Sequence, residues 1–180
     1  MEINKIIPVV NPLELKQEDM PVVVLSDDRR GLIPWAIKAH THGNYNHIML
    51  MVTPKFFFTQ GILLSNVPVE KYMKDFSFLK FYKLLIPQEL KDIIIEQAKA
   101  DLKKPWWKRL YDGLGIFGQL LPGKWGRIIN IPGLNFCSED TRNRLYRVGF
   151  KYPVRPNPAE MEALLSKDPN AQLLGYWFNA

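Results

Sequence analysis

The sequence predicts a single α+β domain, and three observations support this fold class. The chain has 180 residues, long enough for one domain (1–180) to bury a substantial core. Its composition, 47% hydrophobic and 23% charged, is that of a folded globular protein. Short runs rich in β-branched and aromatic residues alternate with longer segments of helical periodicity, and no internal repeat is visible.

The β-branched and aromatic runs predict a small sheet. The expected strands are Val22–Leu25, His47–Val52, Phe56–Leu64 and Phe78–Leu85. Pro54-Lys55 separates the second strand from the third, which predicts an antiparallel hairpin. The proline-containing segment 1–20 is interpreted as an irregular lead-in, and Asn66–Tyr72 as a turn.

Helices are predicted from periodicity together with start and stop signals. The expected helices are Arg29–Ala39, Gln88–Leu102, Cys137–Val148 and a last one from Pro158 to about Lys167. Pro87 stands at the expected first position of the second helix, and Gly149 ends the third. Asn157 and Glu160 have the spacing of a capping box before the last helix. Residues 168–180 are expected to be a tail.

Composition and charge exclude several classes of protein. The net charge is +6, but the positive residues are scattered, so no nucleic-acid partner is expected. No apolar run approaches the ~20 residues of a membrane span. The segment Met1–Pro8 lacks the features of a secretory signal, so we expect a cytoplasmic protein, with delivery by a virion or by lysis left open. A single cysteine excludes an internal disulfide and any four-cysteine metal site, and no cofactor is expected.

Cys137 is the first candidate for chemistry. It follows a Pro132-Gly133 break and opens a segment of helical periodicity, which places it in the first turn of a helix. Unpaired backbone N–H groups and the helix dipole favour a thiolate there. Glu139 and Asp140 oppose the thiolate, so the sequence leaves the sign of the net effect open. The alternative is a buried, inert cysteine in the core.

His47 begins an otherwise apolar strand, a suitable position for an imidazole that accepts the proton of a thiol. The neighbouring strand ends in Thr59-Gln60, and either side chain could hold the imidazole. We expect Gln60, with Thr59 as the alternative if the pleat faces the other way. The spacing of His40, His42 and His47, with Cys137 as a fourth ligand, also raises zinc, but no metal site is expected because this segment has no acidic partner.

The stretch from Lys103 to Trp125 combines aromatic, basic and glycine residues. Such a composition could stack on bases or contact a membrane interface. We interpret it as the roof of a hydrophobic cleft, which also fits an acyl-binding pocket. Peripheral contact with a membrane therefore stays open.

Four segments, spanning about residues 25 to 167, resemble the circularly permuted papain-like cysteine hydrolases, the branch related to NlpC-type amidases. Gly43-Asn44-Tyr45-Asn46-His47 before an apolar strand is similar to their G-x-Y-x-H motif, and Phe136-Cys137-Ser138-Glu139 matches their aromatic-C-S-E. The other two segments are Tyr111-Asp112-x-x-Gly115-Ile116-x-Gly118, and Asn157-Pro158-Ala159-Glu160 with Leu164-Leu165.

The resemblance implies a permuted papain-like core, in which the nucleophile helix packs on an antiparallel sheet that carries the histidine. It implies Cys137 as nucleophile and His47 as base, with the third polar residue at Gln60 or Thr59. The family often has a carboxylate or a second histidine at that third position, and the opening strand here lacks its usual Gly-Asp.

Together these features predict a cysteine hydrolase or acyltransferase that acts on an amide, ester or thioester bond. The expected substrate is a cell-wall peptide or a lipid-linked acyl group. The alternative is a non-catalytic binding protein, or a virion-associated structural protein, that retains the fold. The oligomeric state is left open.

Overall fold

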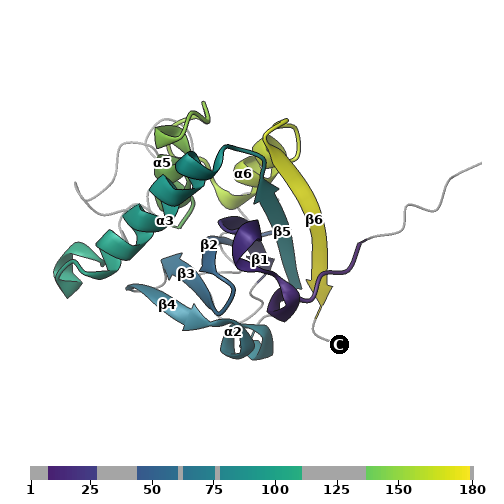
Figure 1. Cartoon of the computed structure of the whole chain (residues 1–180), viewed down its shortest axis with the longest axis horizontal. Helices are drawn as coiled ribbons and strands as arrows, with labels where there is room; N and C mark the ends of the chain where they lie inside the picture. The colour runs from purple at the N-terminus through teal and green to yellow at the C-terminus, as the bar shows by residue number, and fades with distance from the viewer. Residues whose placement is uncertain (1–7, 28–43, 61–62, 76–77, 111–136, 179–180) are drawn as a thin grey trace, which may run out of the picture.

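The computed structural model describes residues 8–27, 44–60, 63–75, 78–110 and 137–178. Its strands form one antiparallel sheet with the order β4-β3-β2-β1-β5-β6 (Figure 1). The strands are β1 (Val22–Asp27), β2 (His47–Thr53), β3 (Phe56–Gln60), β4 (Leu64–Pro68), β5 (Phe78–Leu84) and β6 (Ala171–Phe178). Every residue of β1 is buried, because β1 lies inside the sheet and both of its faces are covered. The fold is therefore α+β.

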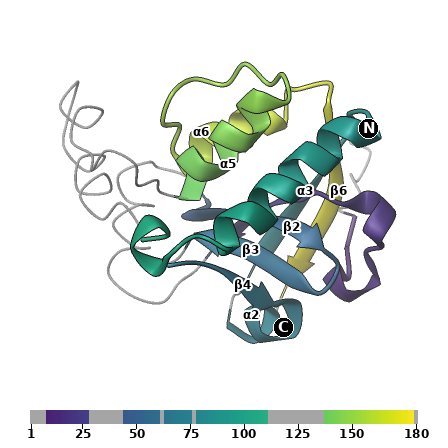
Figure 2. The same ribbon diagram turned by 60° about the vertical axis from the view of Figure 1, so that its left-hand side comes forward.

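The structure describes four α-helices and three short 3₁₀ helices. They are α2 (Val69–Asp75), α3 (Gln88–Leu102), α5 (Cys137–Arg147), α6 (Pro158–Leu165) and the short 3₁₀ helices η1 (Pro12–Glu14), η2 (Gln17–Asp19) and η3 (Trp106–Lys108). Figure 2 shows α3, α5 and α6 together on one side of the sheet, with α2 at its lower end.

Contacts with the sheet show which face α5 and α6 cover. The register aligns Phe58, Leu50, Val23 and Tyr82 in one cross-strand row. The guanidinium of Arg144 in α5 lies 4.6 Å from the ring centroid of Phe58, and Tyr82 donates a 3.4 Å hydrogen bond to Glu162 in α6. Both helices therefore cover the face that carries this row.

The opposite face of the sheet is in contact with α2. Successive side chains of a strand point to opposite faces, so Phe57 lies on the other side from Phe58. The ring of Phe57 packs against Tyr72 of α2, with centroids 5.0 Å apart. The sheet thus lies between α2 and the layer formed by α5 and α6.

Several predicted elements are confirmed. Helix α3 has the predicted bounds, although Pro87 is its N-cap residue rather than its first helical residue. Helix α5 begins at Cys137 as predicted, and Gly149 follows it with a φ of +106°. Helix α6 has the predicted capping box, in which Glu160 N donates to Asn157 Oδ1 at 2.8 Å.

Other predictions were wrong. Asn66–Tyr72, interpreted as a turn, contains the end of β4 and the start of α2. The predicted strand Phe56–Leu64 is divided between β3 and the first residue of β4, and the tail 168–180 contains β6. β4 and β6 are stabilised by pairing with β3 and β5, which local propensity does not report.

Some predictions lie outside the described residues, including the helix Arg29–Ala39 and most of the aromatic stretch. None of the helices that the structure describes is both long and apolar enough to cross a lipid bilayer.

Candidate functional site

His47 and Thr59 are in direct contact. The Nε2 atom of the His47 ring lies 2.6 Å from the Thr59 hydroxyl oxygen, at hydrogen-bond distance. Burial lowers the pKa of His47 from 6.5 to about 4, because the charged imidazolium is poorly solvated there. His47 is therefore neutral at pH 7. Its contact with Thr59 uses Nε2, so Nδ1 is the ring nitrogen that Thr59 does not contact.

Gln60 does not hold the imidazole. Its amide nitrogen donates a 3.0 Å hydrogen bond to the backbone oxygen of Arg109, in the segment that follows α3. Adjacent residues of β3 point to opposite faces, so Thr59 and Gln60 cannot both face His47. The contact belongs to Thr59, the alternative that the sequence had offered, and Gln60 attaches the segment after α3 to the sheet.

Cys137 is the first residue of α5 and is 3% exposed. Its carbonyl oxygen accepts a 3.1 Å hydrogen bond from the Thr141 hydroxyl, one turn later in the helix. Helix α5 packs against β2, the strand that His47 begins. The predicted nucleophile is thus buried at the start of a helix next to the histidine strand.

His47 and α5 approach β2 from different faces. Side-chain alternation places His47 and Thr59 on the face of Phe57, whereas α5 covers the face of Phe58. Because His47 is the first residue of β2, its side chain stands at the end of the sheet.

Arginine side chains pair with both acidic residues that follow Cys137 in α5. The Nε atom of Arg155 donates to Glu139 at 3.2 Å, and both side chains are nearly buried. Arg144 donates to both carboxylate oxygens of Asp140, at 3.0 and 2.9 Å. Each acidic side chain is thus paired with an arginine, so these charges oppose a Cys137 thiolate less than the sequence suggested.

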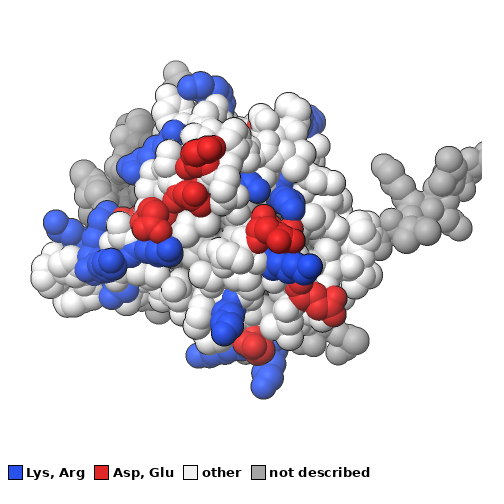
Figure 3. Space-filling view, viewed as in Figure 1, with Lys and Arg blue, Asp and Glu red and all other residues white. Residues whose placement is uncertain are grey.

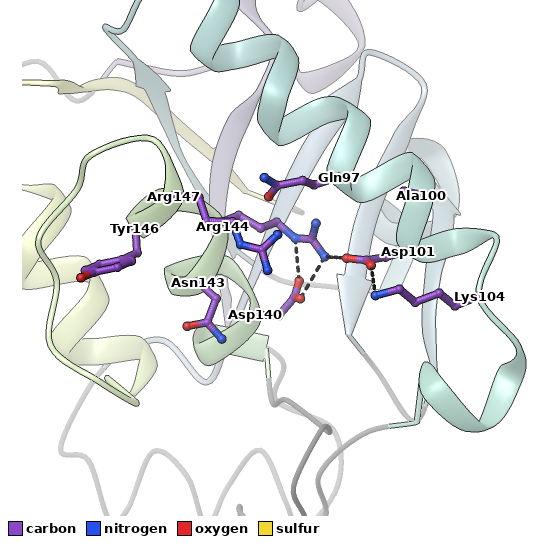
Figure 4. A pocket seen from close by; sticks show the side chains of 9 residues that line it. All are labelled: Gln97, Ala100, Asp101, Lys104, Asp140, Asn143, Arg144, Tyr146 and Arg147. Carbon is purple, nitrogen blue, oxygen red and sulfur yellow. Dashed lines mark hydrogen bonds and ion pairs between the residues drawn. The ribbon is translucent and has the colours of Figure 1, made fainter.

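Arg144 also joins α5 to α3. Its Nη2 atom donates to Asp101 at 2.6 Å, and Asp101 is in turn paired with Lys104 at 2.5 Å. Burial alone would raise the pKa of Asp101, but the hydrogen bonds from Lys104 and Arg144 outweigh it and hold the pKa below 3.8. The carboxylates of Asp140 and Asp101 likewise outweigh burial and raise the pKa of Arg144. These side chains line a cavity of about 500 Å³ between α3 and α5 (Figure 4).

The sequence did not identify this cluster, although one signal was present. Asp140 and Arg144 stand four residues apart in a predicted helix, which is the spacing of an intrahelical ion pair. The part played by Asp101 and Arg155 depends on contacts between distant segments. His40 and His42, considered as zinc ligands, lie outside the described residues.

Comparisons with known proteins show only a distant structural similarity. No protein-family model and no curated protein matches the chain. A solved structure described as the metalloprotein yiiX from Escherichia coli O157:H7, DUF1105, superimposes with a TM-score of 0.62 at 14% identity. The match covers 91% of this chain and 99% of that chain. Similarity at this identity defines a shared α+β fold and carries no activity over.

Proposed function

We propose that this protein is a cysteine hydrolase or acyltransferase of the permuted papain-like type. Cys137 is the nucleophile, His47 the base, and Thr59 the residue that holds the imidazole. The observation that carries the proposal is the 2.6 Å contact between His47 and Thr59 on strands adjoining the helix that Cys137 begins. The similar solved structure is described as a metalloprotein, but the described residues contain no group of three or more His, Cys, Asp or Glu side chains placed to hold a metal ion. The proposed mechanism uses no metal ion.

In the proposed reaction, Nε2–H of His47 donates to Thr59, which leaves Nδ1 to accept a proton. The Cys137 thiol transfers its proton to Nδ1 as sulfur attacks the carbonyl carbon of an amide, ester or thioester. The imidazolium then protonates the leaving amine, alcohol or thiol, and a thioester forms on Cys137. His47 next deprotonates a water molecule or an acceptor, which releases the acyl group and restores the thiol.

Thr59 is suited to orient the ring but not to stabilise its charge. A hydroxyl can accept the Nε2 proton and fix the ring, whereas a carboxylate at this position would also favour the imidazolium. With the pKa of His47 lowered by burial, we expect a resting state of neutral thiol and neutral imidazole. Proton transfer then accompanies the attack on the substrate.

The experiment measures the rate at which iodoacetamide alkylates Cys137 as a function of pH. Because the chain has one cysteine, each mole of label reports on that thiol. An unassisted thiol with a pKa near 8.5 is only a few per cent thiolate at pH 7. We expect His47→Ala to slow alkylation at pH 7 by about tenfold or more, because no imidazole then takes the thiol proton as sulfur attacks the reagent, and Thr59→Val to give an intermediate rate.

Thr53→Val is the matched control, because Thr53 is also a strand threonine and its hydroxyl has no hydrogen-bond partner among the described residues. It should react like the wild type. Equal rates for the wild type and His47→Ala at pH 7 would contradict the proposed base. If a thioester acyl probe in addition leaves no acyl group on Cys137 by mass spectrometry, the non-catalytic alternative is the better account.

A further inference from the structure

Two adjacent tryptophans are exposed where α3 gives way to η3. Trp106 is 60% and Trp107 55% exposed, and neither belongs to the buried core. Their rings meet edge to face, with centroids 5.9 Å apart. Tryptophan normally buries much of its surface, so a neighbouring pair in water indicates a surface that contacts something else.

Lysines surround this pair. Lys103, Lys104 and Lys108 are all exposed, and together with Trp106 and Trp107 we call these residues the Trp–Lys surface. Figure 3 shows blue side chains gathered at the left of the molecule, where Figure 1 draws the end of α3. Asp101 pairs with Lys104 and offsets one of the three charges. The surface is therefore both aromatic and positively charged.

Backbone contacts hold the Trp–Lys surface against the sheet. Immediately after η3, the backbone oxygen of Arg109 accepts hydrogen bonds from Leu64 N at 2.8 Å and from the Gln60 side chain at 3.0 Å. The Arg109 guanidinium donates in return to the backbone oxygen of Leu64 at 3.2 Å. The tryptophans are thus presented by an anchored turn, which limits the entropy lost when they bind.

We propose that the Trp–Lys surface docks this protein onto an anionic lipid bilayer. Indole rings favour the boundary between headgroups and acyl chains, and lysines beside them contact anionic headgroups while their stems lie along the apolar layer. A protein partner with an acidic rim and a nucleic acid are the other occupants that this chemistry admits. The bilayer is favoured because two exposed indole rings stand together with exposed lysines on either side of them in the chain, the combination found where proteins meet a membrane interface.

The test is co-sedimentation of the full chain with vesicles of phosphatidylcholine alone, or of equal parts phosphatidylcholine and phosphatidylglycerol. We expect binding to the anionic vesicles only, weakening as salt is raised. Replacing Lys103, Lys104 and Lys108 together by alanine should weaken binding roughly 100-fold, because each lysine near an anionic surface contributes about fivefold. Trp106→Ala/Trp107→Ala should weaken binding even at low salt.

Tyr146→Ala/Lys151→Ala is the matched control, because Tyr146 is also an exposed aromatic residue next to cations, on α5. This variant should bind like the wild type. Three results would overturn the proposal. The control variant could lose as much vesicle binding as the lysine and tryptophan variants, the wild type could fail to bind anionic vesicles at low salt, or it could bind single-stranded RNA in place of vesicles. Cys137→Ser should still bind vesicles, so failure of the proposed catalysis and failure of docking are distinguishable.

Discussion

Replacing Arg144 by methionine should destabilise the fold more than any other single change among the described arginines. Its side chain is 4% exposed, and it bonds Asp140 of its own helix and Asp101 of α3. Its guanidinium also lies on the ring of Phe58 in β3. One side chain therefore links two helices to the sheet. Methionine keeps the apolar stem but leaves both carboxylates without this partner.

The size of the effect follows from burial. Breaking a buried ion pair by removing one partner costs about 3–5 kcal/mol. The side chains of Asp140 and Asp101 are 13% and 22% exposed, so water solvates them in part once Arg144 is gone. Lys104 also remains beside Asp101. We therefore expect a loss near the lower end, about 3 kcal/mol, against a total stability of about 5–15 kcal/mol.

The assay is urea unfolding followed by tryptophan fluorescence at neutral pH, with Arg147→Met as the control. Arg147 lies one turn further along α5 and is exposed, so its loss should change stability by less than about 0.5 kcal/mol. In a double-mutant cycle, Asp140→Asn should show a coupling to Arg144→Met of about 1 kcal/mol or more. Equal stabilities of the two methionine variants, or zero coupling, would refute the assigned role of Arg144.

Three further predictions concern pH, a glycine and a helix cap. Because burial lowers the pKa of His47 to about 4, the unfolded chain binds a proton between pH 6.5 and 4 that the folded chain does not bind. The free energy of unfolding should therefore fall as pH drops through this range, by at most about 3 kcal/mol. His47→Gln should remove this component from the pH dependence of urea unfolding. Gly175→Ala should lower stability in thermal unfolding by about 2 kcal/mol or more and expose the N-terminal segment to proteolysis, because φ is +151° and a Cβ would lie 2.4 Å from Pro8 O. Gly149→Ala is the control: its Cβ would stand in open space, so it should cost only backbone strain. An equal loss of stability in both variants would contradict the steric argument. Asn157→Ala should cost about 1 kcal/mol in urea unfolding by removing the cap of α6, and no change would show that the capping box adds nothing to stability.

The long helices could be predicted because their signals are local. Proline before α3, glycine after α5 and the asparagine cap of α6 act within a few residues of the chain, and each element was found where these signals placed it. Elements without such signals were missed. β4 ends in Pro68 and β6 contains Gly175, residues disfavoured in strands. Yet every residue of β4 pairs with β3, and β6 pairs with β5 along its length apart from a register shift next to Gly175.

The sequence by itself determined which side chains are available for chemistry: one cysteine at a helix start and a histidine at the head of an apolar strand. Tertiary structure decided how they are surrounded. The strand register turned Thr59 rather than Gln60 toward His47, because neighbouring residues of a strand face opposite ways. Arg144 and Arg155 neutralise acidic residues near Cys137 through contacts between side chains that only the folded chain brings together.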